Sequence, residues 1–119
     1  MEMTTQPDCI FCKIVTRETP GNVVYQDEQV TAFRDLNPQM PVHVLIVPNV
    51  HVANTQELDP RHDAAVGAVI RAAQEVAKRE GVSESGYRLV VNTGRDAHNV
   101  VPHLHVHLVG GRPMGWPPG

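Results

Sequence analysis

Three histidines stand at alternate positions in this chain, His103, His105 and His107, with aliphatic residues between them. In an extended strand successive side chains point to opposite faces, so the three imidazoles would share one face and the aliphatic residues the other. Imidazoles about 7 Å apart, at roughly 3.3 Å rise per residue, make a poor apolar core. They make a good chemical site, because each ring can donate, accept, bind a metal or attack as a nucleophile near neutral pH.

Such a row has two chemical interpretations and one structural one. One imidazole could attack phosphorus or a carbonyl carbon while its neighbours stabilise developing charge or protonate the leaving group. Alternatively, the row could hold a metal ion. The third interpretation is a set of partly exposed surface histidines, which the core residues between them disfavour.

A second group of reactive side chains is the pair Cys9 and Cys12, spaced as Cys-x-x-Cys. Two thiolates at this spacing supply half of a tetrahedral zinc site. A reduced thiol pair without a metal is the plain alternative, and a redox dithiol is disfavoured because no thioredoxin-like strand-then-helix pattern surrounds it. We favour zinc, whose other two ligands must come from elsewhere in the chain.

The expected compartment also bears on the thiols. The first residues, MEMTTQPD, lack an apolar signal core, so we expect a cytoplasmic protein. A structural disulfide between Cys9 and Cys12 is not expected in that reducing compartment.

The composition is that of an ordinary globular protein, and it limits the partners. With 119 residues, 41% of them hydrophobic and 19% charged, residues 1–119 are expected to form one domain, with residues 1–7 disordered and residues 110–119 as a C-terminal tail. The formal net charge of -3 and the lack of a Lys/Arg cluster argue against nucleic-acid binding. The longest uncharged run, residues 36–56, is interrupted by prolines and histidines, so no membrane span is expected.

Local patterns predict the elements that position these side chains. Five β-branched runs bounded by turn residues are predicted strands, at residues 23–27, 29–35, 42–47, 87–92 and 102–109. A helix is predicted over residues 60–80, because Asp59 is a good N-cap, apolar residues recur at helical spacing and Gly81 is a natural stop. Residues 9–17 could form a short helix. The prediction is an α+β domain with a mainly antiparallel sheet of about five strands, one long helix packed on it and a short N-terminal helix.

The tract 103–109 resembles the His-x-His-x-His-x-x motif of the histidine-triad (HIT) superfamily, in which x is apolar. The resemblance covers roughly residues 8–119, and its other matching segments are residues 33–35, 42–48 with His51 after them, 86–92 and 110–119. The last two segments resemble the Hint-type nucleotide-binding branch. The resemblance implies a HIT-type fold.

The resemblance also implies an activity. His105 would be the nucleophile that attacks the α-phosphorus of a purine nucleotide substrate, forming a nucleotidyl-histidine that water resolves. His107 would contact a phosphate oxygen or the departing group, and His103 would complete the catalytic triad. The function would be a purine nucleotide-binding hydrolase, such as a nucleoside phosphoramidase. A dinucleoside polyphosphate hydrolase, a nucleotide-binding regulatory protein with incidental hydrolysis and a pure metal-binding module are the alternatives.

Matching positions imply a nucleotide site. Asp35 matches the ribose-binding acid of the family, Leu36 follows it at the nucleoside pocket, and Asn92 would meet the phosphate or ribose. His43 matches a family histidine adjoining the triad. Taken without the resemblance, Asp35 could merely end a strand, and His43 could be a satisfied core histidine.

The loop before the triad supplies phosphate contacts in the family, and the matching positions are His98, Asn99 and Val100. Asn99 stands where the family commonly has Gln, and Val100 stands where the Hint branch often has Ser. Asn is shorter and Val has no hydroxyl to donate, so phosphate handling differs here, although His98 could supply a donor. An ordinary polar turn is the plain alternative.

Two further expectations come from the resemblance. In zinc-binding relatives the Cys-x-x-Cys pair is joined by a histidine after the Val-Pro strand and by the first triad histidine, which match His51 and His103. Zinc would then make His103 a structural ligand instead of a catalytic acid. The tail around Trp116 could be a frayed end, but in the Hint branch it reaches the neighbouring subunit's site, so we expect a homodimer.

Overall fold

The computed structural model describes residue 6 and residues 8–119, and the expected disorder of the remaining residues among 1–7 lies outside the described residues. The chain forms one five-stranded antiparallel sheet with the strand order β1-β2-β3-β5-β4. The strands are β1 Val23–Gln26, β2 Val30–Arg34, β3 Val42–Pro48, β4 Tyr87–Val90 and β5 Val106–Gly110. The predicted α+β architecture is confirmed.

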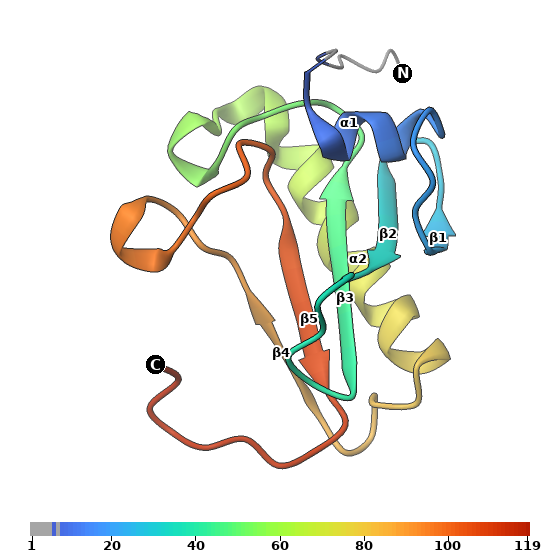
Figure 1. Ribbon diagram of the computed structural model, residues 1–119, viewed down its shortest axis with the longest axis vertical. Coiled ribbons are helices and arrows are strands. Elements are labelled where there is room, and N and C mark those ends of the chain that lie inside the picture. The colour runs from blue at the N-terminus through green and yellow to red at the C-terminus, as the bar shows by residue number, and fades with distance from the viewer. Residues whose placement is uncertain (1–5, 7) are drawn as a thin grey trace.

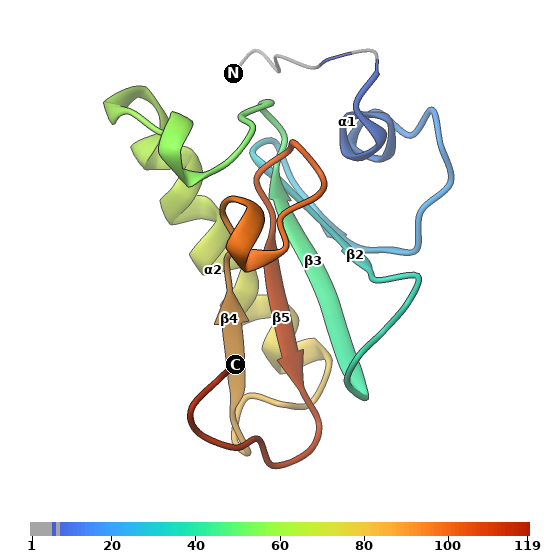
Figure 2. The ribbon, with the colours of Figure 1, turned by 60° about the vertical axis from the view of Figure 1, so that its left-hand side comes forward.

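Two helices pack on opposite faces of this sheet (Figures 1 and 2). The long helix α2, Asp63–Arg79, covers one face, and the short helix α1, Ile10–Val15, lies against the other. Neither they nor the other described helical segments are long and apolar enough to cross a membrane.

The long helix begins with a tighter turn than the sequence predicts. Pro60–His62 form a 3-10 turn, and the α-helix proper starts at Asp63. The Asp59 side chain accepts from the Arg61 main-chain N–H at 2.9 Å, as expected of an N-cap. Gly81 follows the helix at φ 77°, a conformation that glycine adopts at little cost.

The two faces of the sheet carry separate cores. Beneath α2, the alanine and valine side chains of the helix pack on alternate residues of β2, β3 and β5. On the other face, α1 packs on Phe33, Leu45 and Val47. This second core holds α1 close to β5 and to the segment before it, which together carry the three histidines.

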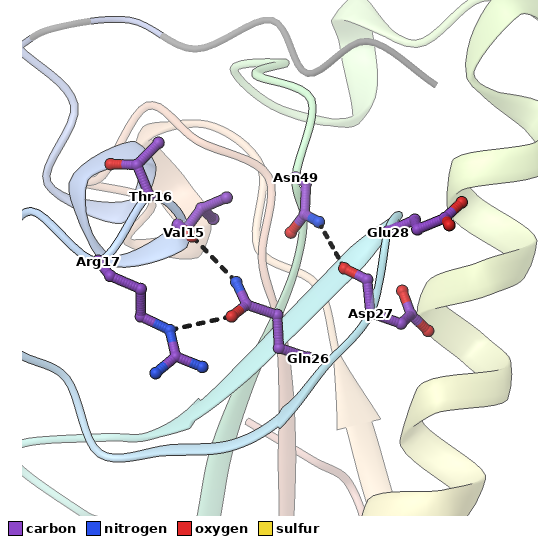
Figure 3. Close-up of a pocket in the computed structure, with 7 residues that line it drawn as sticks. All are labelled: Val15, Thr16, Arg17, Gln26, Asp27, Glu28 and Asn49. Atoms are coloured by element: carbon purple, nitrogen blue, oxygen red, sulfur yellow. Dashed lines mark hydrogen bonds between the residues drawn. The ribbon is translucent and has the colours of Figure 1, made fainter.

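A hydrogen-bond network anchors the end of α1 to the sheet. Gln26 donates to the Val15 carbonyl at 2.9 Å and accepts from the Arg17 guanidinium at 2.9 Å, and Asn49 donates to the Asp27 carbonyl at 3.0 Å. Figure 3 shows these three hydrogen bonds as dashed lines. The network fixes the position of α1, which carries Cys-x-x-Cys.

The predicted strand over residues 102–109 is shorter in the structure, because its sheet pairing starts only at Val106. The main-chain N–H of Leu104 instead donates to the carbonyl of Val52 at 2.6 Å. This contact directs residues 103–105 toward the loop after β3, and both His103 and His105 are buried there.

Candidate active site and metal cluster

The histidine row lies on the face of the sheet that α2 leaves uncovered. In the β3–β5 ladder His107 stands opposite Leu45, and Leu108 stands opposite Val44. Leu108 and Val44 pack in the core beneath α2, so His107 and Leu45 point to the other face. The ring of His105 lies beside that of His107, with centroids 5.0 Å apart at 65°.

Phe11 of α1 packs against the other two rings of the row. Its ring centroid lies 6.0 Å from that of His103 and 5.2 Å from that of His105, both edge-to-face. A third edge-to-face contact, at 5.2 Å, joins Phe11 to Phe33. The three imidazoles therefore lie on the α1 side of the sheet, and Phe11 packs against the rings of His103 and His105.

His105 has one ring nitrogen engaged by the main chain. Its Nδ1 lies 2.7 Å from the carbonyl oxygen of His103. A carbonyl can only accept, so Nδ1 of His105 carries a hydrogen, and in the neutral ring Nε2 then holds the lone pair. A neutral imidazole with a free Nε2 is the nucleophilic form of histidine.

His107 joins a short chain of polar side chains on the same face. Its Nδ1 lies 2.9 Å from Nε2 of His43, which in turn lies 3.4 Å from a carboxylate oxygen of Asp35. Burial, with further contributions from the neighbouring rings of His105 and His43, lowers the pKa of His107 to about 4. His107 is therefore neutral at pH 7.

A cavity of about 250 Å³ lies between α1, β2 and β3. His105 lines it together with Asp35 and Leu36, and the rest of its wall is mostly apolar, including Phe11, Ile14, Phe33, Leu45 and Val101. Its volume is just under the range of pockets for drug-sized ligands, about 300–1,000 Å³. Leu36 is 96% exposed at the cavity mouth. The cavity thus places a histidine and a carboxylate beside an apolar slot.

The loop between β4 and β5 contributes less to this cavity than the resemblance implies. Val101 lines the cavity, but His98, Asn99 and Val100 are not among its lining residues. Val100 is 74% exposed. Asn92 lies just beyond the end of β4 and does not line the cavity either. The structure thus brings His105, Asp35 and Leu36 together and leaves these four residues in the adjoining loop.

Cys9, Cys12, His51 and His103 form a second cluster, in which the ligating atoms all lie within 4.8 Å of one another. The Sγ–Nδ1 distances are 3.2 Å for Cys9 to His103, 3.3 Å for Cys12 to His51 and 3.4 Å for Cys12 to His103. A tetrahedral zinc with Zn–S of about 2.3 Å and Zn–N of about 2.0–2.1 Å has S···N edges of about 3.5 Å. The donor set and its spacing therefore fit zinc.

Burial acts in opposite senses on the thiol and the imidazoles of the cluster. Desolvation raises the pKa of the Cys12 thiol to about 11, so zinc would have to displace a proton from this thiol on binding. Burial lowers the pKa of His51 and takes that of His103 to about 4, which favours the neutral form in which an imidazole binds a metal. Nε2 of His103 lies 2.9 Å from the carbonyl of Pro48 and donates to it, which leaves Nδ1 as the acceptor that faces the thiols.

A larger hollow of about 730 Å³ lies beneath the end of α1, where Figure 3 shows its lining. Its polar groups are largely paired with one another: Gln26 bonds to Val15 and Arg17, and the buried Asn49 bonds to Thr31 and Asp27. Of these bonds, the one from Gln26 to the Val15 carbonyl joins β1 to the last residue of α1.

Sequence reasoning missed three contributors to these sites. Phe11 stands between the two cysteines, and that position was its only signal. Pro48 contributes a carbonyl, and Gln39 contributes a main-chain N–H that donates to Nδ1 of His43 at 3.0 Å. Main-chain groups carry no signature in the identity of a residue, so neither could be found from the sequence.

Comparisons with known proteins agree with this arrangement. Residues 16–114 match the family model described as HIT domain. The "Purine nucleoside phosphoramidase" of Escherichia coli (strain K12) is 47% identical over 108 residues, which cover 91% of each chain. The "14 kDa zinc-binding protein" of Zea mays is 49% identical over 112 residues, covering 92% of this chain and 87% of the relative.

A solved structure shows the same fold. The HIT family hydrolase from Legionella pneumophila Philadelphia 1 aligns with a TM-score of 0.91 and 43% identity, covering 94% of this chain and 100% of that chain. The resemblance inferred from the histidine tract is therefore confirmed, and the chain belongs to the HIT domain family.

Proposed function

We propose that residues 1–119 form a single HIT domain that acts as a purine nucleotide-binding hydrolase, a nucleoside phosphoramidase in the first instance. One observation carries the proposal: His105, with its Nδ1 bonded to a carbonyl, lines a cavity that also contains the Asp35 carboxylate. A nucleophile and a group that can accept from ribose hydroxyls thus share one pocket. The identity of 47% to a purine nucleoside phosphoramidase supports the same substrate class.

In the proposed reaction Nε2 of His105 attacks the α-phosphorus of a nucleoside phosphoramidate. A P–N(His105) bond forms, the P–N bond to the leaving group breaks, and the departing amine takes up a proton from solvent, so the nucleotidyl-imidazole that keeps its Nδ1–H is cationic. Water then attacks the phosphorus, the P–N(His105) bond breaks, and the proton that the water loses returns to solvent, which releases the nucleoside monophosphate and restores the neutral ring. A hydrogen bond from His107 to a non-bridging oxygen would stabilise the charge that develops in both steps.

The other nucleotide contacts are proposed from the positions that match those of the family. Asp35 would accept from the ribose hydroxyls, and Leu36 would cover the nucleoside at the cavity mouth. Asn92, His98, Asn99 and Val100 would meet the phosphate or leaving group from the adjoining loop, and His43 would support His107. The engagement of both ring nitrogens of His103 supports a structural role for that residue, in place of the catalytic one.

Cys9, Cys12, His51 and His103 would hold one zinc ion, which would supply structural cross-linking and no chemistry on the substrate. Cys9 and Cys12 belong to the turn that starts α1, His51 to the loop after β3, and His103 to the segment before β5. These residues would thereby tie three distant segments together beside His105.

A homodimer is proposed from the exposed edge of the sheet. β4 is a terminal strand in the sheet order, and Leu89 and Val91 are exposed on and beside it. Unpaired edges with apolar side chains invite association. Sedimentation at several concentrations should give twice the monomer mass, and a monomer throughout would overturn this part.

The hydrolase proposal is tested with a substrate panel and intact-protein mass measurement. Adenosine and guanosine phosphoramidates should be cleaved faster than dinucleoside polyphosphates. Brief mixing with substrate and acid-free quenching should reveal protein heavier by one nucleotidyl group. If no phosphoramidate is cleaved but nucleotides bind, the regulatory alternative replaces the hydrolase.

A further inference from the structure

The main chain decides which ring nitrogen of His43 carries a hydrogen. The main-chain N–H of Gln39 donates to Nδ1 of His43 across 3.0 Å, and His43 is buried. A neutral imidazole has one N–H and one acceptor nitrogen. Because Nδ1 accepts, Nε2 of His43 bears the hydrogen.

That hydrogen is directed at the histidine triad. Nε2 of His43 lies 2.9 Å from Nδ1 of His107 and 3.4 Å from a carboxylate oxygen of Asp35. The shorter distance is that of a well-formed hydrogen bond, so Nδ1 of His107 accepts. The hydrogen of His107 is therefore on Nε2, which makes that atom a donor.

The neighbouring His105 is arranged in the opposite sense. Its Nδ1 donates to the carbonyl of His103 at 2.7 Å, so in the neutral ring its Nε2 is an acceptor. Two adjacent rings with centroids 5.0 Å apart thus carry their hydrogens on different nitrogens. This difference makes Nε2 of His105 an acceptor and Nε2 of His107 a donor. A main-chain carbonyl sets the tautomer of His105, and a main-chain amide sets that of His107 through His43.

We propose that His43 is a positioning residue that relays the Gln39 amide to His107 and holds His107 as the Nε2–H tautomer. The proposal rests on the hydrolase function proposed above. His107 then donates to a phosphate oxygen while His105 attacks, and the two rings cannot exchange roles. Asp35, the other group that faces Nε2 of His43, links the relay to the cavity that would hold the nucleoside.

The same three side chains, Asp35, His43 and His107, also lie close enough together to hold a metal ion. A neutral imidazole that binds a metal through one nitrogen carries its hydrogen on the other. A cation on Nε2 of His43 would therefore place an N–H on Nδ1, directly facing the N–H of Gln39. Two opposed donors in a buried contact are unfavourable, so the geometry favours a shared hydrogen over a metal.

The tautomers can be read directly in the wild-type protein. Two-bond nitrogen–proton NMR correlations distinguish Nδ1–H from Nε2–H rings without any substrate. We expect Nε2–H for His43 and His107, and Nδ1–H for His105. A hydrogen on Nδ1 of His107 would overturn the proposal.

A matched pair of variants tests the consequence. In His43→Gln the amide can accept from Gln39 and donate to His107, as the imidazole does. In His43→Glu, of nearly the same size, both oxygens accept, so His107 must present its hydrogen at Nδ1. We expect kcat within about tenfold of wild type for His43→Gln and a loss of about 10²–10³-fold for His43→Glu, the effect of one lost transition-state donor, with KM changing less than kcat.

A merely structural role for His43 predicts that His107 adopts the same tautomer in both variants, and that result would refute the relay. The NMR spectrum of each variant shows whether it is folded and which tautomer His107 adopts. If wild type cleaves no phosphoramidate, the proposed function fails, while the tautomers of the three rings still decide the relay.

Discussion

Nδ1 of His105 lies 2.7 Å from the carbonyl oxygen of His103, and this contact joins the two sites of the molecule. His103 offers its Nδ1 to the cysteine thiols and its main-chain oxygen to the ring of His105. Phe11 packs on both rings and lies between the two cysteines in the chain. The cluster of Cys9, Cys12, His51 and His103 and the proposed nucleophile His105 are therefore held in place by the same residues, His103 and Phe11.

Replacing the proposed nucleophile should abolish turnover without unfolding the protein. In His105→Asn we expect kcat for adenosine phosphoramidate to fall by at least about 10⁴-fold, the scale seen when a covalent nucleophile is removed. Nucleotide affinity by calorimetry should stay within about threefold of wild type, because most of the cavity wall is unchanged. An active His105→Asn enzyme would refute the covalent role.

Removing the metal should destabilise the protein and loosen His105. Elemental analysis should show about one zinc per chain in native protein. A metal held at a hundred times its Kd contributes about 2.7 kcal/mol to the free energy of unfolding, so chelation should lower the melting temperature and broaden the NMR signals of the His105 ring. Native protein without zinc would end this proposal.

The variant Cys9→Ser separates zinc binding from helix capping. Sγ of Cys9 accepts from the main-chain N–H of Cys12 at 3.3 Å, as an N-cap does. Serine is itself a good N-cap, so a fall in stability would come from the lost ligand. We expect Cys9→Ser to bind no zinc and to melt at the temperature of chelated wild type, with no further change on chelation.

The pKa of His107 predicts how acid affects stability. Burial lowers it from 6.5 to about 4, so between these values the unfolded chain holds a proton that the folded chain does not. The contribution of His107 to the free energy of unfolding is therefore fully present above pH 6.5. It falls as pH decreases toward 4, by at most about 1.4 kcal/mol per pH unit. The half-buried ring is partly screened by solvent, which makes the slope smaller.

Urea unfolding of wild type and His107→Gln between pH 7 and pH 4.5 measures this contribution. The variant lacks the titrating ring but keeps the zinc ligands, so the difference between the two curves isolates His107. The free energy of unfolding of wild type should fall more steeply with acid. If the free energies of unfolding of the two proteins change equally with pH, the pKa of His107 is not lowered by folding.

Much of this architecture could be predicted from the sequence because it depends on local patterns. Alternation along β3 and β5 places Leu45 and His107 on one face and Val44 and Leu108 on the other, as periodicity predicts. The start of β5 could not be predicted in this way. The N–H of Leu104 pairs with a loop far away in the chain, and no local pattern records such a contact.

The candidate site likewise has features that the sequence predicts and features that it does not. The row of histidines and Cys-x-x-Cys were visible as motifs, but their roles depend on main-chain atoms of Pro48, Gln39 and His103. Residue type predicts that an imidazole can donate or accept. Only the fold decides which of the two each nitrogen does.

The assignment of Asp35 to ribose makes a prediction about substrate hydroxyls. A hydrogen bond to a charged group contributes about 1.5–3 kcal/mol, so a 2′,3′-dideoxynucleotide should bind wild type about 10- to 100-fold more weakly than the ribonucleotide. In Asp35→Asn this difference should shrink to a few-fold, because the charge is gone. The amide oxygen can still accept from the main-chain N–H of Asn37, which Asp35 binds at 2.8 Å, so the loop keeps its shape. Calorimetric titration of the ribonucleotide and the dideoxynucleotide into wild type and Asp35→Asn measures all four affinities. If the two proteins prefer the ribonucleotide by the same factor, the ribose hydroxyls bind a group other than Asp35.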